Sequence, residues 1–200
     1  MRKLIVSIHS TANDIVTGPA SDETNFMAWA QAGIEDSLQS FLKSLAAVDT
    51  ILLGRATYED LVRKWPKARE WRQVSDVILR MADKINATPK IVVTRNQSLA
   101  LEWGEFEPPT RLSGPRVEQQ IKELKVSDGG EIITFGSPTL VQSLTNAGLV
   151  DEYRLLIHPV IVNEGQRLFE KLTGRTDLRL ISADSFAHGA ILIRYAPIAG

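Results

Sequence analysis

Hydrophobic residues along this chain follow two patterns. In the first, β-branched and other apolar residues form continuous runs of about four to eight residues, which is typical of buried strands. In the second, apolar residues recur every three or four positions, which is typical of a helix with one buried face. The first pattern predicts strands over 3–10, 49–54, 90–95, 131–136 and 152–162, and the second predicts helices over 37–48, 57–65, 75–87, 116–125 and 137–148.

The predicted strands and helices alternate along the chain. This order favours an α/β fold with a mainly parallel sheet and right-handed crossovers. Near the C-terminus two strands follow each other without a helix, so residues 178–197 predict an antiparallel hairpin centred on His188 and Gly189. The Pro-rich stretch 105–115 is interpreted as a surface loop. We therefore expect a single domain that covers residues 1–200.

The composition narrows the classes of function. Hydrophobic residues make up 44% of the chain and charged residues 24%, which is ordinary for a soluble globular protein. A net charge of -1 argues against a nucleic-acid surface or an anionic-membrane patch, so neither partner is expected. The chain has no cysteine, which excludes disulfides and thiolate metal sites and fits a cytoplasmic location. Its three histidines are scattered without carboxylates at ligand spacing, so no metal is expected.

Glycine, hydroxyl and guanidinium groups follow three of the predicted strands. In open α/β sheets, ligands bind beyond the carboxyl ends of the strands. Helix N-termini bind phosphate through unpaired N–H groups, and arginine binds it through paired hydrogen bonds. Such residues are also common as turns and caps, and the chain lacks G-x-G-x-x-G and P-loop motifs, so the pattern predicts only a phosphate-binding α/β domain whose ligand stays open. The residues are Gly54, Arg55 and Thr57, then Thr94, Arg95 and Asn96, then Gly136, Ser137, Pro138 and Thr139.

Five stretches of the chain resemble one family: "LLGRATYE", "KIVVTRN", "ITFGSPTLVQSL", "AGLVDEYRLLIHPVIV" and "GQRLF". The chain is similar to the C-terminal reductase domain of the bacterial riboflavin-pathway bifunctional deaminase–reductase, and to its stand-alone relatives in the dihydrofolate reductase-like superfamily. The resemblance spans nearly the whole chain. It implies a three-layer dihydrofolate reductase-like fold, in which helices flank a central, mostly parallel mixed sheet. It also implies NADPH as cofactor and a homodimer that uses the C-terminal strands and "YRLLIHPV".

The resemblance further implies which residues contact NADPH. Gly54, Arg55 and Thr57 would meet the pyrophosphate and the adenosine-side phosphate. Thr94, Arg95 and Asn96 would meet the adenine ribose and its 2′-phosphate. Phe135, Gly136, Ser137 and Thr139 would hold the pyrophosphate from the second helix start, and Ser10, Val16 and Thr17 would lie near the nicotinamide.

The proton donor departs from the family pattern. Family members carry Ser-Leu-Asp-Gly after the first strand, whereas this chain has Thr-Ala-Asn-Asp at 11–14. Asn13 therefore takes the place of the acid, and an amide can hydrogen-bond a substrate but cannot supply a proton. Asp14 and Asp36 are the other catalytic candidates, the latter near the start of the 37–48 helix. Both carboxylates could instead be solvated or cap helices, and water could supply the proton.

Phe26 and Trp29 are candidate substrate contacts. They are aromatic residues in a polar, loop-like stretch and could stack on a flat heterocycle, or could simply cover the core. The leading hypothesis is an NADPH-dependent reductase that transfers a hydride to a pterin, pyrimidine or ribosylaminopyrimidine. One alternative is the riboflavin-pathway reduction of 5-amino-6-(5-phosphoribosylamino)uracil. Another is a nucleotide-binding module without turnover.

Overall fold

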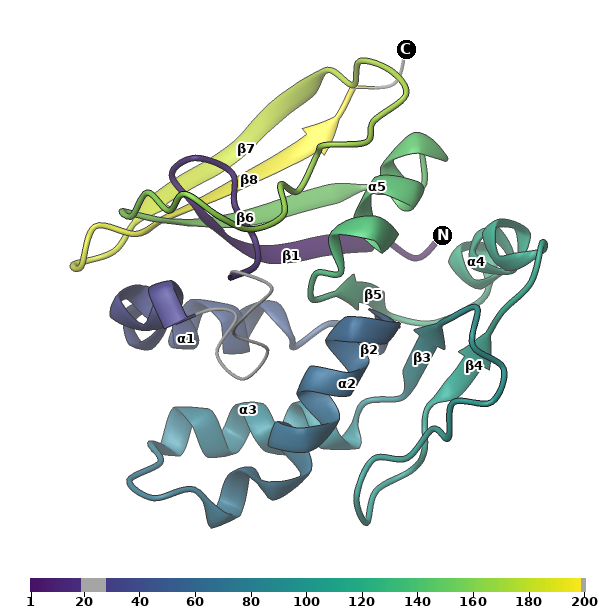
Figure 1. Cartoon of the computed structure of the whole chain (residues 1–200), viewed down its shortest axis with the longest axis horizontal. Helices are drawn as coiled ribbons and strands as arrows, with labels where there is room; N and C mark the ends of the chain where they lie inside the picture. The colour runs from purple at the N-terminus through teal and green to yellow at the C-terminus, as the bar shows by residue number, and fades with distance from the viewer. Residues whose placement is uncertain (19–27, 199–200) are drawn as a thin grey trace.

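A sheet of eight strands runs through the part of the chain that the computed structural model describes, residues 1–18 and 28–198 (side chains of 28 and 31–36 excepted). The strand order is β4-β3-β2-β5-β1-β6-β8-β7, from lower right to top in Figure 1. The strands are β1 (Leu4–Thr11), β2 (Val48–Gly54), β3 (Lys90–Val93), β4 (Thr110–Leu112), β5 (Glu131–Thr134), β6 (Glu152–His158), β7 (Leu178–Ser185) and β8 (Ile191–Pro197).

Neighbouring strands from β4 through β6 are parallel, and the last two are antiparallel. β8 pairs antiparallel with β6, and β7 pairs antiparallel with β8, which is the hairpin predicted for 178–197. The first six strands therefore end at one common edge of the sheet. This edge is where ligands of open α/β sheets bind.

Helices cover both faces of the sheet, which gives three layers. The helices are α1 (Gln31–Ser44), α2 (Arg55–Lys64), α3 (Asp76–Ala87), α4 (Val117–Val126) and α5 (Pro138–Asn146), with short 3-10 helices η1 (Ala28–Ala30) and η2 (Trp65–Glu70). α1, α2 and α3 pack on one face through side chains such as Tyr58 and Ile85. α4 and α5 pack on the other face through Ile121 and Val141.

The alternation of side chains along each strand creates these two cores. In β1, Leu4 and Val6 face α4 and α5, whereas Ile5 faces α1, α2 and α3. In β2, Leu52 and Leu53 divide in the same way. Each of these five side chains is completely buried, as expected for strands covered on both faces. The predicted α/β fold with a mostly parallel sheet is therefore confirmed.

Three elements differ most from the sequence-based expectation, and the first is β6, which ends at His158 rather than at residue 162. α1 begins at Gln31 rather than at residue 37. The prediction missed these turns because Ile34 is the one large apolar residue in 31–36 and Gly33, a poor helix former, stands beside it.

β4 lies inside the stretch 105–115, which was interpreted as a loop. Its three residues pair with β3, with Thr110 opposite Ile91. Pro109 before so short a strand concealed it.

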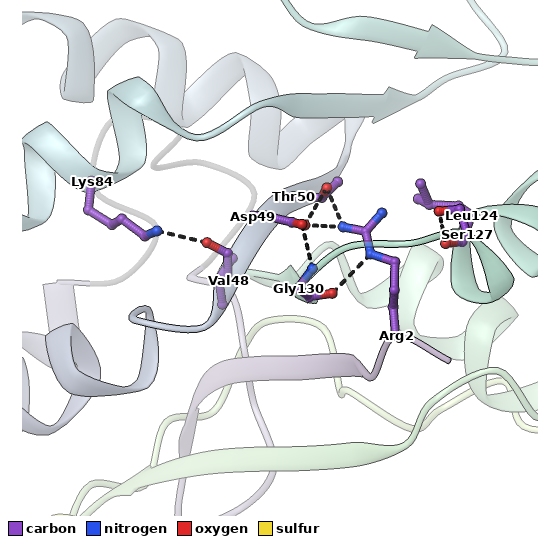
Figure 2. Close-up of polar contacts among 8 residues, drawn as sticks. All are labelled: Arg2, Val48, Asp49, Thr50, Lys84, Leu124, Ser127 and Gly130. Atoms are coloured by element: carbon purple, nitrogen blue, oxygen red, sulfur yellow. Dashed lines mark hydrogen bonds and ion pairs between the residues drawn. The ribbon is translucent and has the colours of Figure 1, made fainter.

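Arg2 ties together the strand ends that lie away from the ligand edge. Its Nε donates to the Gly130 carbonyl at 2.9 Å, and its guanidinium contacts Asp49 and Thr50 (Figure 2). The Gly130 amide donates to Asp49 Oδ2 at 2.5 Å. Although burial opposes ionisation, the bonds from Gly130, Thr50 and Arg2 hold the pKa of Asp49 below its usual value. The network holds β5 between β1 and β2.

No helix in the described part of the chain combines the length and apolar character needed to cross a membrane.

Candidate functional site

Gly54 and Ser137 bring the carboxyl ends of β2 and β5 together. A Cβ placed on Gly54 would lie 2.5 Å from the Cβ of Ser137 and would overlap its Oγ. Only glycine allows so close an approach. The glycine was expected to let a phosphate approach the backbone. The structure supplies another reason for it, since the space that a side chain would fill is taken by the start of α5.

The N-termini of α2 and α5 meet at this contact. Gly54 is the N-cap of α2 and Ser137 is the N-cap of α5, and neither makes a side-chain capping bond. Ser137 has φ 62°, in the left-handed region, and Gly136 before it has φ 100°. A serine in that region is strained, and such strain is concentrated at functional sites. The N-termini of both helices thus lie close together with no side-chain acceptor at either N-cap, which suits an anion; in α5 the first N–H belongs to Thr139, because Pro138 has none.

The remaining side chains at these two helix starts vary in exposure. Arg55 is exposed, and its Nη1 donates to both carboxylate oxygens of Glu59 at 3.0 Å. Thr57 is half-buried and Thr139 is exposed. Phe135 turns away from the helix starts and packs edge-on against Phe41 of α1, with ring centroids 5.5 Å apart. Phe135 therefore lies on the face of the sheet that α1 covers.

The turn after β3 is held by its own hydrogen bonds. The Asn96 amide donates to Thr94 Oγ1 at 3.1 Å, and the Asn96 side chain accepts from the Ser98 amide at 3.0 Å. Arg95 is exposed on this turn. Arg111 of β4 donates to the Asn96 carbonyl at 2.5 Å, so a second guanidinium braces the turn. Sequence reasoning missed Arg111 because it missed β4.

The loop after β1 packs against the segment that follows β6. Asn13 donates to the Val162 carbonyl at 2.7 Å and accepts from Thr11 Oγ1 at 2.8 Å. Thr17 Oγ1 accepts from the Gln166 amide at 2.9 Å, and Val16 is buried in the core on the α5 side. The amide of Asn13 is thus engaged in holding this loop in place.

Asp14 and Ser10 complete this loop. Asp14 has φ 66° and is half-buried. Burial raises the pKa of Asp14, against the opposing effect of Arg167 and of the Phe169 and Leu168 amides. Ser10 is buried, and its Oγ donates to a neighbouring carbonyl at 2.9 Å. Of the residues proposed for catalysis, Asn13 and Asp14 lie together. Phe26 lies outside the described residues, as does the side chain of Asp36.

A pocket of about 410 Å³ lies under α1, against β1, β6 and the C-terminal hairpin. Its volume is within the range of about 300–1,000 Å³ that is usual for small-ligand sites. Apolar and polar side chains share its lining. They are Ile8, Leu38, Phe41, Met81, Leu156 and Leu192, together with Ser7, His9, Ser37, Ser40, Lys43, Ser44, Arg154, Asp184 and Arg194.

Two histidines pair at the edge of this pocket. His9 Nδ1 lies 2.9 Å from His158 Nε2, and the rings stack with centroids 5.2 Å apart. The Trp29 ring meets His158 edge-on at 5.5 Å. Burial, and to a lesser extent His158, lowers the pKa of His9 to about 4, and burial lowers that of His158. Both rings are therefore neutral near neutral pH. Sequence reasoning interpreted each histidine separately, because only the register of β1 on β6 brings them together.

A buried ion network closes the other end of the pocket. Glu152 is 2% exposed and accepts from Arg154 Nε at 2.7 Å and from Arg194 Nε at 2.8 Å. Although burial opposes ionisation, these two guanidinium groups hold the pKa of Glu152 below its usual value. Arg154 and Arg194 are directly opposed on β6 and β8. Sequence reasoning did not predict this network, because arginine in a strand usually marks a solvated face.

No cluster of three or more metal-ligating side chains occurs within residues 1–18 and 28–198.

Comparison with known protein families gives a match over most of the chain. A family model described as "RibD C-terminal domain" matches residues 16–192. Among curated proteins, YyaP of Bacillus subtilis (strain 168), which is described as uncharacterized, is 26% identical over 194 residues. That alignment covers 97% of this chain and 94% of YyaP.

Solved structures share the fold over the whole chain. A candidate riboflavin biosynthesis protein of Shewanella sp. PV-4 superposes with a TM-score of 0.71 at 13% identity, covering 98% of this chain and 99% of that one. RibD of Acinetobacter baumannii gives 0.65 at 13% identity, covering 100% of this chain and 59% of RibD. Dihydrofolate reductase of Enterococcus faecalis, solved with NADP(H), gives 0.55 at 13% identity, covering 98% and 97%. These likenesses confirm the dihydrofolate reductase-like fold.

Proposed function

The chain belongs to the RibD C-terminal domain family, and on that premise we propose that it is a reductase that uses NADPH to reduce a small heterocycle. The family is related to reductases, and its fold is shared by a dihydrofolate reductase that was solved with NADP(H). Pterins, pyrimidines and ribosylaminopyrimidines are the substrate classes considered.

The contact between Gly54 and Ser137 is the observation that carries the cofactor assignment. It brings two helix N-termini to one spot, and neither N-cap closes it with a side-chain bond. A pyrophosphate there would accept from the first N–H groups of both helices. Anion binding would also explain why Ser137 keeps a strained backbone.

Residues around this spot would hold the rest of NADPH. Arg95 is exposed on a turn braced by Arg111, so its guanidinium could reach the 2′-phosphate of the adenine ribose. Thr94 and Asn96 form that turn. Ser10, Val16 and Thr17 would lie near the nicotinamide, which supplies the hydride when the cofactor is bound.

The pocket under α1 is the proposed substrate site. It adjoins the carboxyl end of β1 through His9 and the end of β5 through Phe41, which packs on Phe135. The side chains of Phe41 and Leu156 give it apolar walls for a flat ring, and serines and arginines give it hydrogen-bond donors. Such a mixture of apolar walls and few polar groups is usual for small-molecule sites.

Two alternatives are considered. Reduction of 5-amino-6-(5-phosphoribosylamino)uracil in riboflavin biosynthesis would use the same site. A nucleotide-binding module without turnover is favoured by Asn13, because an amide stands in the place of the family's acid and is engaged with Thr11 and Val162. The first alternative differs from the main proposal in its substrate. The second differs in having no turnover.

The C-terminal hairpin is the proposed homodimer contact. β7 is the edge strand of the sheet, and Leu180 and Ile181 on it are 54% and 40% exposed. Exposed apolar side chains on an unpaired edge favour association with a second copy. Light scattering of the purified protein should give twice the mass of 22.2 kDa, and Leu180→Glu should shift it toward the monomer. A monomeric wild type would contradict the dimer.

Turnover tests the proposed activity. NADPH oxidation should be followed in the presence of dihydropterins, oxidised pyrimidines and ribosylaminopyrimidines. Consumption of NADPH with one class identifies the substrate class. Tight NADPH binding without consumption across all of them would contradict the reductase and support the nucleotide-binding module.

A further inference from the structure

The histidine pair has polar atoms that the proposed cofactor site does not use. His158 is 1% exposed, and its Nδ1 is buried without a hydrogen-bond partner in the described part of the chain. The same is true of Nε1 of Trp29, whose ring meets His158 edge-on. Buried polar atoms without partners are rare in folded proteins, and each needs an explanation.

The hydrogen bond between the two rings has two arrangements. A neutral imidazole carries one N–H, so at 2.9 Å one ring donates and the other accepts. If His9 Nδ1–H donates, His158 keeps its proton on Nδ1. Two buried N–H groups, those of His158 and Trp29, then lack an acceptor side by side. If His158 Nε2–H donates, its Nδ1 is a lone pair, and only the Trp29 N–H lacks an acceptor.

The second arrangement is favoured, because it leaves one buried N–H group without an acceptor instead of two, and buried N–H groups without partners are rarer than buried acceptors without partners. It places the acceptor on Nδ1 of His9, so the proton of that ring is on Nε2. His9 lines the pocket under α1. Its Nδ1 is bonded to His158, so Nε2 is the ring nitrogen that remains available to a ligand in the pocket. The pair thus presents a neutral N–H donor at the substrate site.

We propose that His9 contacts the substrate through this Nε2–H, and that His158 is a positioning residue that fixes the tautomer. The proposal rests on the proposed function and deepens it. When a ring C=N or C=O carbon is reduced, it gains the hydride, and the π electrons move onto the adjoining nitrogen or oxygen. The His9 N–H stabilises that developing charge by a hydrogen bond, and water then supplies the proton. No proton leaves His9, so both rings stay neutral.

Charged groups also line the pocket. On β6 and β8, Arg154 and Arg194 both donate to Glu152. On β7 and α1, Asp184 and Lys43 line the pocket as opposite charges. A neutral donor suits a neutral ring that carries a carbonyl or an imine nitrogen next to the reduced carbon. The inferred substrate class is therefore a heterocycle with an acceptor at that position.

Nitrogen NMR of histidine side chains tests the tautomer without any substrate. The chain has three histidines, so protein labelled with ¹⁵N-histidine gives a simple spectrum, and His188→Gln assigns one of them. The expected result is His9 protonated on Nε2 with Nδ1 as acceptor. His158→Phe should release His9 into a mixture of tautomers, whereas the amide donor of His158→Gln should preserve the Nε2–H form. A His9 ring protonated on Nδ1 would overturn the proposal. So would a His9 tautomer that is the same in the wild type and in His158→Phe.

Pterin, added with NADP⁺ present, tests the contact. It carries a ring carbonyl and imine nitrogens, and it should shift the His9 Nε2–H resonance while that of His188 stays in place. An unmoved His9 resonance at millimolar pterin would overturn the substrate contact. The two proposals fail separately. If the protein does not bind NADPH but pterin still shifts the His9 Nε2–H resonance, only the reductase proposal is contradicted. If the protein binds NADPH but His9 is protonated on Nδ1, only the His9 inference is contradicted.

Discussion

His9 Nδ1 lies 2.9 Å from His158 Nε2, across the parallel strands β1 and β6. In the register of the two strands, Ser10 stands opposite Ile157. His9 precedes Ser10 by one residue and His158 follows Ile157 by one residue, so the two histidines are offset neighbours on the same face of the sheet, the face that α1 covers. Burial keeps both rings neutral, and the pairing aligns one of them with the pocket. It therefore links the folding of two strands to the chemistry of the proposed substrate site.

Acid should destabilise the fold through His9. Burial and His158 lower the pKa of His9 from 6.5 to about 4, so between these values the unfolded chain binds a proton that the folded chain does not. Stability is then fully present above 6.5 and is lost as the pH falls toward 4, with a slope of about 1.4 kcal/mol per pH unit for one proton. Urea unfolding across this range measures the slope.

The variant His9→Gln should flatten that slope. His158, whose pKa is also lowered by burial, should keep part of the dependence in His9→Gln. A pH dependence that is the same in wild type and His9→Gln would contradict the assignment of the effect to His9.

Gly54→Ala should destabilise the fold, because the new Cβ would overlap Ser137. Overpacking of this kind costs about 1–3 kcal/mol. The matched control is Gly174→Ala, where a Cβ meets no atom within 4 Å. Ser137→Gly should remove both the obstacle and the strain at φ 62°, and so restore stability in the Gly54→Ala background. Additive effects of the two changes in thermal unfolding would contradict their contact.

Glu152→Gln should be more destabilising than the loss of any surface carboxylate. It leaves the Arg154 guanidinium, which is 8% exposed, without its closest counter-ion, and breaking a buried pair costs about 3–5 kcal/mol. The control is Asp177→Asn, which breaks an exposed pair with Arg175 and should cost about 0–1 kcal/mol. Equal losses in urea unfolding would show that the Glu152 network contributes no more than a surface pair.

Local periodicity was enough to predict most of the fold. The strands β1, β2, β5 and β6 and the hairpin were found because their apolar runs are long or closely bounded by turns. β4 was missed, because three residues after Pro109 carry too little pattern. The first turns of α1 were missed, because their apolar pattern is too weak to predict a helix and their helical structure depends on the turns that follow.

The candidate site was predictable only in part. The strand-end rule placed Gly54 and Ser137 at one edge, but their direct contact depends on how α5 begins. The pairing of His9 with His158 depends on the register between β1 and β6, which a single sequence does not encode locally. Arg194 was missed for the same reason, since its counter-ion Glu152 lies on another strand. Arg154 was missed although Glu152 stands only two residues before it on β6, because a glutamate and an arginine at that spacing are also typical of an exposed strand face.

Calorimetric titration of the protein with NADPH and with NADH tests the central claim, that the carboxyl edge of the sheet binds NADPH. NADPH should bind more tightly than NADH. Arg95→Ala should weaken NADPH binding by about 10-fold or more, the value of one charge-assisted hydrogen bond to phosphate, and should leave NADH binding unchanged. Arg175→Ala, on a surface remote from these helix starts, should change neither affinity. Equal affinities for the two cofactors, or no binding of either, would contradict the account.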